Sequence, residues 1–440
     1  MQKEVIKLTE NELKNIIKES VKNVVSIMAE ANNPAFDPDR KSGNMKQIWD
    51  VIKRKQENLY DMVFGKLSDK LDDMTRQKME MMGKEYLDIP DVICRAGNDK
   101  LPERVLIINM SSSLMCPSFY MGLCQIKNGA CYAQRDENQY TTTVMPQRFK
   151  TDLMHTQMLR QYQNGNKKPM KEYFRIIELY IQLANKYATD IYKKNIEEAE
   201  RVSMERNGRS LSWREREAIK FASMSNKITD VRLNETGDFH CQLAVNLWAD
   251  FAKKIKKKYG INTHAYTARN LDFSKASQHI NMNYSHGGNY ESEHQAPRFF
   301  QVISDSAYDK LTPVKLDTKH QPILGPLFNG QKYYKCPCSD KSTKCNLCGV
   351  CFNKNETGES YVIVVKLHGL KNASGLKGAY TIKEMKPILD KYAEYGWMND
   401  SEKGHSDVKS LRDFSDNVLR LRKDATKKTK NNTNKKKKKK

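Results

Sequence analysis

Cysteines are the residues whose number and spacing point most directly to chemistry. The 440-residue chain has 10 cysteines, and eight of them fall into two short segments. No secretion signal is recognisable, so clustered thiols are expected to be metal ligands rather than disulfides. Cys94 and Cys241 stand apart from both segments and are expected to be core residues.

The first Cys segment, 116–131, contains Cys116, Cys124 and Cys131. It follows an apolar run, 105–109, that predicts a buried strand, and α/β proteins hold ligands where such strands end. Three thiolate ligands leave the fourth coordination position of a metal ion open. A catalytic zinc ion or the unique iron of a [4Fe–4S] cluster uses such a position. The alternative is three buried cysteines without a metal.

The second Cys segment, 336–351, gives the stronger metal signal. It contains five thiols, including a CxxCxxC run: Cys336, Cys338, Cys345, Cys348 and Cys351. Zinc ribbons and iron–sulfur loops both use such closely spaced thiols. The spacing slightly favours an iron–sulfur cluster, because a zinc site with four cysteine ligands would leave one of the five thiols unused. A zinc site is the alternative.

Polar residues follow or line three predicted strands at 231–239, 263–267 and 281–285. In an α/β sheet, polar side chains at the carboxyl ends of strands commonly hold a ligand. The candidates are Asn234, Glu235, Gly237, Asp238, Arg269 and Asn283. Asn283 shares one face of its strand with Asn281 and Ser285. That face suits hydrogen bonds to a polar substrate, and a solvated edge strand is the alternative.

The elements that position these residues alternate along the chain. Helices are predicted at 148–225 with breaks at 164–168 and 207–212, and at 242–259, 382–397 and 407–423. Further strands are predicted at 299–304 and 361–369. This alternation predicts an α/β fold whose parallel sheet forms a partial (β/α) barrel, with Cys-rich metal-binding loops and helical N- and C-terminal extensions.

The organisation predicted along the chain has six parts: an amphipathic leader helix (1–31), a linker (32–44), a helical arm (45–95), the Cys-containing α/β body (96–370), C-terminal helices (371–423) and a disordered poly-Lys tail (424–440). The apolar stripe of the leader either packs on the body or docks on a partner protein.

The net charge is +23, from 76 Lys and Arg against 53 Asp and Glu. Residues 422–440 hold 11 basic and 1 acidic residues, so the tail is the expected nucleic-acid contact. A solvated, lysine-rich surface is the alternative for the rest of the chain. The sequence has no apolar run long enough to cross a membrane, which predicts a soluble protein without membrane contact.

Five motifs in order resemble the "gene product eighty-eight" family of tailed-phage proteins. They are GNDKLP (97–102), the cysteine run ending in CYA (116–133) with Arg148 downstream, NETGDF (234–239), HAYTAR (264–269) and CP…CxxCxxC (336–351). Residues 5–21 are similar to leader helices on proteins of phages that infect Bacteroides. The resemblance implies a phage-encoded protein of the host cytoplasm or the virion, with the leader docking on a phage protein.

That family is similar to radical S-adenosylmethionine enzymes. The resemblance implies that Cys116, Cys124 and Cys131 ligate a [4Fe–4S] cluster beside bound S-adenosylmethionine. Glu235, Asp238 and Arg269 would be catalytic. Asn234, Glu235, Gly237, Asp238 and Asn283 would bind the cofactor.

Three functions therefore remain open. The first is a radical-type iron–sulfur enzyme that modifies a nucleotide, nucleic acid or peptide. The second is a nucleic-acid-binding protein of phage replication or packaging, stabilised by zinc. The third is a virion or cargo protein.

Overall fold

The computed structural model describes most of the predicted body and part of the helical arm. The described residues are 43–65, 71–82, 93–98, 101–111, 115–121, 123, 137, 144–224, 227–285, 297–303, 305–339, 343, 345–366, 382–399 and 402. The predicted leader helix, the helix predicted at 407–423, the Lys-rich tail, Cys124 and Cys131 lie outside these residues.

Within the described residues, nine strands form one sheet in the order β1-β2-β3-β4-β5-β6-β9-β8-β7. Their bounds are β1 Arg95–Ala96, β2 Val105–Ile108, β3 Asp230–Leu233, β4 Asn262–Thr267, β5 Asn281–Ser285, β6 Arg298–Ile303, β7 Leu327–Phe328, β8 Gln331–Lys335 and β9 Tyr361–Lys366. All neighbours are parallel except β1 with β2 and β7 with β8. The predicted α/β fold with a mostly parallel sheet is confirmed.

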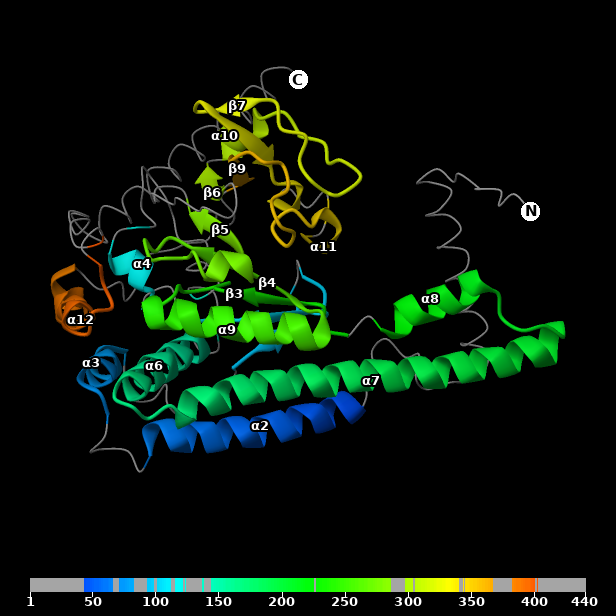
Figure 1. The fold of residues 1–440 in the computed structure, drawn as a ribbon, viewed down its shortest axis with the longest axis horizontal. Coiled ribbons are helices and arrows are strands. Elements are labelled where there is room, and N and C mark those ends of the chain that lie inside the picture. The colour runs from blue at the N-terminus through cyan, green and yellow to red at the C-terminus, as the bar shows by residue number, and fades with distance from the viewer. Residues whose placement is uncertain are drawn as a thin grey trace, which may run out of the picture.

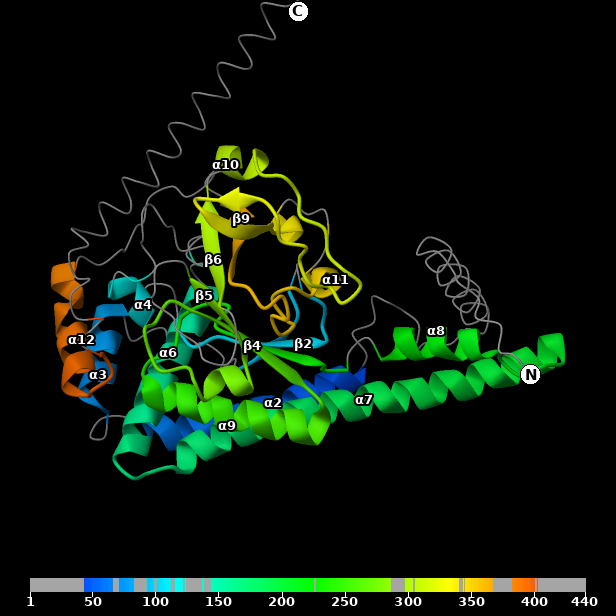
Figure 2. The same ribbon diagram turned by 45° about the horizontal axis from the view of Figure 1, so that its top comes forward.

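Helices cover one face of this sheet. The described helices are α2 Gly43–Phe64, α3 Asp73–Met82, α4 Pro117–Tyr120, α6 Val144–Gln163, α7 Lys168–Asn207, α8 Trp213–Ser223, α9 Gln242–Tyr259, α10 Asp305–Asp309, α11 Cys345–Cys348 and α12 Ile382–Glu394. In Figures 1 and 2, α9 and α7 lie along one side of β3 and β4, and α11 lies on the other side. The C-terminal part of α7, with α8 beside it, extends beyond the sheet.

The two sheet faces differ in chemistry because side chains alternate along each strand. Leu106, Val231, Leu233, Ala265 and Met282 belong to the main apolar core, which they share with helices including α6, α7 and α9. The opposite face, called here the polar face, carries Arg232, His264, Tyr266, Asn281 and Asn283 at neighbouring register positions. It is covered by the second Cys segment, because Val105 and Ile107 on this side pack against Phe352, Cys345 and Cys351.

Local sequence explains the ends of several helices. Helix α8 begins with a capping box in which Ser212 and Glu215 satisfy each other's backbone N–H groups. Helix α9 buries residues at helical spacing, among them Val245, Trp248 and Ile255, and ends at Gly260 in the left-handed conformation (φ 71°). These signals explain why the bounds predicted for α9, 242–259, are confirmed.

The other predicted elements agree within a few residues, with some additions. The breaks predicted at 164–168 and 207–212 separate α6, α7 and α8. Helix α2 begins at Gly43, so the last two residues of the predicted linker are helical. Strands β1, β7 and β8 were not predicted. None of the described helices has both the length and the apolar character needed to cross a membrane.

Candidate functional site

The first Cys segment begins at the carboxyl end of β2, as predicted. Cys116 is buried with 7% of its surface exposed. Two residues later, the Ser118 hydroxyl donates a 2.6 Å hydrogen bond to Oδ2 of Asp238, just beyond β3. Asp238 also accepts hydrogen bonds from the Thr267 hydroxyl and the Ala268 N–H, each 2.7 Å, at the end of β4. Asp238 thus joins the first Cys segment to the carboxyl ends of β3 and β4.

Burial dominates the electrostatics of Asp238. It raises the pKa of this carboxyl above its ordinary value, although Ser118, Ala268 and Thr267 donate hydrogen bonds that oppose the rise. With these donors in place, both carboxylate oxygens are engaged by the protein. The geometry therefore gives Asp238 the role of a positioning residue.

The loop between β3 and α9 approaches the loop after β2 very closely. Asn234 and Gly237 both adopt positive φ, 57° and 79°. A Cβ atom built on Gly237 would lie 2.2 Å from Oγ and 2.4 Å from N of Ser111. Only glycine fits there, which explains the glycine of NETGDF by packing rather than by cofactor contact.

Glu235 lies among positively charged side chains. It accepts hydrogen bonds from Arg95 and Asn98, and Arg148 Nη2 lies 3.9 Å from its Oε2. Burial alone would raise the pKa of Glu235, but Arg232, Arg95 and Arg148 together lower it. The carboxylate is therefore a buried anion inside an ionic network.

The GNDKLP motif supplies part of that network. Asn98 Oδ1 accepts a 2.8 Å hydrogen bond from the N–H of Leu101, and Gly97 adopts a positive φ of 62°. In this turn the Asn98 amide nitrogen donates to Glu235. The structural role of the GNDKLP motif is therefore to form a turn whose asparagine binds Glu235, which the sequence alone did not indicate.

Arg269 is fully engaged by the protein. Its guanidinium binds Glu402 at 2.7 and 2.8 Å, and donates to the carbonyl oxygens of Phe239, His240 and Trp397. A guanidinium has five N–H donors, so no donor is left for a ligand. Arg269, predicted to be catalytic, instead joins the end of β4 to the segment that follows α12.

At the carboxyl ends of β2 and β3, three buried polar atoms have no hydrogen-bond partner among the described residues. They are the hydroxyl oxygens of Ser111 and Thr236 and Oδ1 of Asn234. All three residues are at most 2% exposed. Buried polar groups without partners are uncommon and mark places where a ligand or water binds. Asn234 was predicted; Ser111 and Thr236 were missed, and the SSS run at 111–113 was the available signal.

The asparagines of β5 contact the second Cys segment. Asn281 Nδ2 donates to the Phe352 carbonyl, and Asn283 Nδ2 donates to the Cys351 carbonyl at 3.2 Å. Strand β5 pairs with β4 and β6, so the edge-strand alternative is wrong. Asn283 lies on the polar face, paired with Tyr266 of β4, and the amide also donates to the Ala265 carbonyl.

The second Cys segment gathers all five of its cysteines in one cluster. Cys338 and Cys348 are buried in it, and Cys336, Cys345 and Cys351 pack against them. The Tyr334 hydroxyl lies 3.1 Å from Sγ of Cys348. As the side chains stand in the described part of the chain, no group of three or more His, Cys, Asp or Glu is arranged around a metal position.

A second buried network lies on the helix side of the sheet. Asp152 binds Lys78 Nζ at 2.7 Å and His240 Nε2 at 2.9 Å, and all three are fully buried. Burial alone would raise the pKa of Asp152, but Lys78 and His240 lower it. Burial lowers the pKa of His240, and Asp152 opposes this only in part. This network connects α3, α6 and the NETGDF loop.

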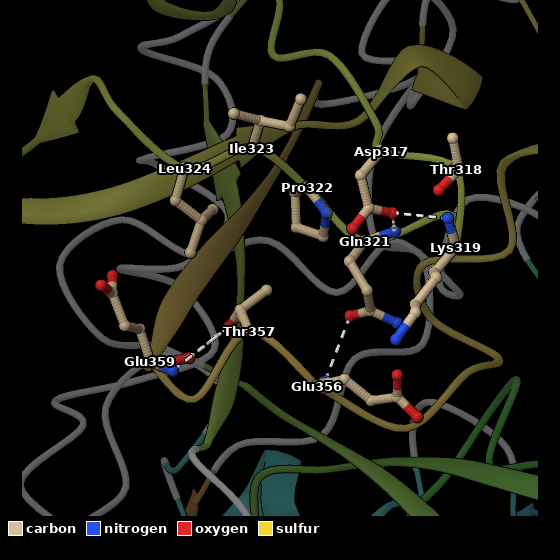
Figure 3. A pocket seen from close by; sticks show the side chains of 10 residues that line it. All are labelled: Asp317, Thr318, Lys319, Gln321, Pro322, Ile323, Leu324, Glu356, Thr357 and Glu359. Carbon is tan, nitrogen blue, oxygen red and sulfur yellow. Dashed lines mark hydrogen bonds between the residues drawn. The ribbon is translucent and has the colours of Figure 1, made fainter.

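A surface hollow of about 370 Å³ lies between residues 317–324 and 356–359. Gln321 spans it and accepts a hydrogen bond from the Glu356 N–H (Figure 3). The Gln321 amide also donates to the Lys354 carbonyl. None of the predicted site residues lines it. The hollow therefore does not coincide with the predicted chemistry.

Comparisons with protein-family models, with curated proteins and with solved structures return no match for this chain. The candidate site therefore rests on its own geometry.

Proposed function

We propose that this chain is an iron–sulfur enzyme of the radical S-adenosylmethionine type, acting on a nucleotide, nucleic acid or peptide. The observation that carries the proposal is the set of three unpartnered polar atoms of Ser111, Asn234 and Thr236. They lie at the carboxyl ends of β2 and β3, beside the first Cys segment. Hydroxyl and amide groups there suit the nucleoside and amino-acid parts of such a cofactor.

The strand order supports the same proposal. Strands β2 to β6 are parallel and adjacent in chain order, as in an open (β/α) barrel. In that architecture ligands bind where the strands end, which is where Cys116 lies. We therefore propose a partial barrel with its reaction centre at this end.

The proposed roles of Cys124 and Cys131 come from the sequence pattern, and those of the described residues from their contacts. Cys116, with Cys124 and Cys131, would hold the [4Fe–4S] cluster, whose chemistry is reductive cleavage of S-adenosylmethionine to start hydrogen abstraction from substrate. Asn234 and Thr236 would contact the cofactor. Asp238 would hold the loop after β3 against Ser118, and Glu235 would hold the same loop against Arg95, since protein donors occupy both carboxylates.

Metal content tests the first Cys segment. We expect protein prepared without oxygen, with iron and sulfide supplied, to bind about four irons there. The Cys116→Ala/Cys124→Ala/Cys131→Ala variant should lose that iron and the formation of 5′-deoxyadenosine from S-adenosylmethionine. The matched control is Cys94→Ala/Cys241→Ala, which removes two buried cysteines outside both segments. Equal iron in the triple variant and the wild type would contradict the proposal.

Cofactor binding tests the polar atoms. Thr236→Val keeps the side-chain shape and removes the unpartnered hydroxyl, so we expect S-adenosylmethionine to bind about 5- to 100-fold more weakly. Thr263→Val is the matched control, because its hydroxyl is also buried without a partner but lies at the start of β4. Equal affinity of Thr236→Val and wild type would exclude contact at this hydroxyl.

The alternative is a nucleic-acid-binding protein stabilised by zinc, favoured by the five clustered cysteines of the second Cys segment. It predicts zinc without iron, and salt-dependent nucleic-acid binding that survives deletion of residues 424–440. Binding that disappears with the tail would leave the tail as the only contact.

A further inference from the structure

The outer side of α8 carries an exposed apolar ridge. Trp213 and Phe221 are 74% and 72% exposed, the largest values among the exposed large apolar side chains of the described part of the chain. Glu217 lies midway between them at helical spacing, so the three side chains follow one ridge of the helix. An exposed apolar ridge of this kind is typical of a surface that another protein segment covers.

The opposite side of α8 already packs on α7. Ile219 shares a small apolar core with Ala199 of α7, and the Asn195 amide donates a 2.9 Å hydrogen bond to the Ser223 hydroxyl. Successive residues of a helix are turned by about 100°, so Glu217 and Ile219 lie on nearly opposite sides. The ridge therefore faces away from α7.

The N-terminal part of the chain joins the described structure close to this ridge. Helix α2 packs along α7, and the Val63 carbonyl near its end accepts a 2.9 Å hydrogen bond from Gln161, shortly before α7 begins. The two helices are therefore antiparallel, and the start of α2 is its end nearer α8 (Figures 1 and 2). Residues 32–42 can span at most about 36–40 Å. Since α8 is about 17 Å long, the leader (1–31) can reach its ridge.

The leader supplies an apolar surface that matches the ridge. An amphipathic helix is predicted there, and its apolar stripe recurs at helical spacing in Leu13, Ile16, Ile17, Val21, Val24, Val25 and Met28. Most of the stability of such a helix comes from packing its apolar face against another surface. The stripe therefore requires an apolar partner, and the ridge of α8 is one within its reach.

The size of the ridge favours a segment of the same chain over a separate molecule. A tryptophan and a phenylalanine bury about 150–250 Å² each, so the ridge offers roughly 300–500 Å² to its partner. Stable interfaces between separate proteins bury about 800 Å² on each side. A second copy or another protein held by this ridge alone would therefore bind weakly. A tethered segment avoids most of the cost of association because its effective concentration is high.

We infer that the apolar stripe of the leader packs on the Trp213–Phe221 ridge of α8 within the same chain. The leader, α8 and the C-terminal part of α7 then form one helical extension beside the sheet. The inference does not depend on the proposed function, because neither Cys segment and no residue of the candidate site takes part in this contact.

Hydrogen exchange of the full-length protein, read by mass spectrometry, tests this contact from the side of α8. The amides of residues 13–28 should exchange slowly in wild type and about 10-fold or more faster in Trp213→Ser/Phe221→Ser. Both replaced side chains are exposed, so this variant should fold as wild type does. Ile323→Ser/Leu327→Ser removes two exposed apolar side chains from another surface and is the matched control. It should leave the exchange of residues 13–28 unchanged.

The reciprocal test changes the leader. Ile17→Asp/Val24→Asp places two charges on the apolar stripe and should raise the exchange of residues 213–223 by about 3-fold or more. Asn15→Asp/Asn23→Asp adds the same two charges away from the stripe and should leave that exchange as in wild type.

Three results would overturn the inference. One is equal exchange of residues 13–28 in wild type and in Trp213→Ser/Phe221→Ser. Another is slow exchange of these residues that is lost on dilution of the protein, which would assign the ridge to a second copy. The third is fast exchange of residues 13–28 in purified wild type, which would assign the leader to a separate partner.

Discussion

The Ser118 hydroxyl donates a 2.6 Å hydrogen bond to the Asp238 carboxylate, across 120 residues of sequence. Ser118 lies two residues after Cys116, and Asp238 lies in the loop that follows β3. Asp238 also binds Thr267 and Ala268 at the end of β4. One carboxylate therefore fixes the loops after three successive parallel strands, which is where an α/β protein builds its site.

Removing the Ser118 hydroxyl should weaken the fold. Both partners are buried, at 0% and 3% exposure. Ser118→Ala should lower the free energy of unfolding by about 1.5–3 kcal/mol, the usual effect of a hydrogen bond to a charged group. Urea denaturation measures it. Exposed Ser210→Ala should change stability by less than about 0.5 kcal/mol; equal effects of the two variants would mean that the hydrogen bond contributes nothing.

Comparing alanine variants of Gly237 and Gly260 separates two destabilising effects, steric crowding and an unfavourable backbone conformation. Both have positive φ, 79° and 71°. Gly260→Ala meets no atom within 4 Å and should cost about 1–2 kcal/mol. Gly237→Ala places a methyl group 2.2 Å from Ser111 Oγ and should cost at least about 3 kcal/mol or prevent folding. Similar urea midpoints for the two variants would show that the Ser111 loop moves away freely.

Glu402 should be essential for stability through Arg269. Both side chains of this pair are fully buried. Glu402→Gln leaves the guanidinium without its counter-charge and should cost about 3–5 kcal/mol. Asp390→Asn, in the exposed Lys386–Asp390 pair, is the control and should cost about 0.5 kcal/mol or less. Arg269→Lys that keeps full stability but loses activity would instead restore the predicted catalytic role.

The sequence pattern predicted the bounds of helices and strands better than it predicted the hydrogen-bond partners of the site residues. Strand β5 has the predicted bounds, 281–285, yet its asparagine face binds backbone carbonyls of residues 351 and 352. Arg269 was noticed at a strand end, but its partner Glu402 lies 133 residues away. Local periodicity carries no information on such distant contacts. Strand β8 (QKYYK) was missed because it is short and has lysines at both sides of its tyrosines.

Acid should destabilise this protein through its buried histidines. The ring of His155 stacks 5.9 Å from that of His240, and its Nε2 lies 2.9 Å from the Tyr173 hydroxyl. Burial lowers the pKa of His155 to about 3, and a positively charged His240 would lower it further. In the unfolded chain His155 then binds a proton near pH 6.5, whereas in the folded chain it stays neutral at that pH.

Stability should therefore be constant above about pH 7 and fall as the pH drops from 6.5 towards 3. The slope should reach about 1.4 kcal/mol per pH unit for each buried histidine. His155→Gln keeps a polar group for Tyr173 and should make the slope shallower in urea denaturation between pH 7 and 4.5. A slope that His155→Gln does not change would show that His155 is not protonated on unfolding in this range.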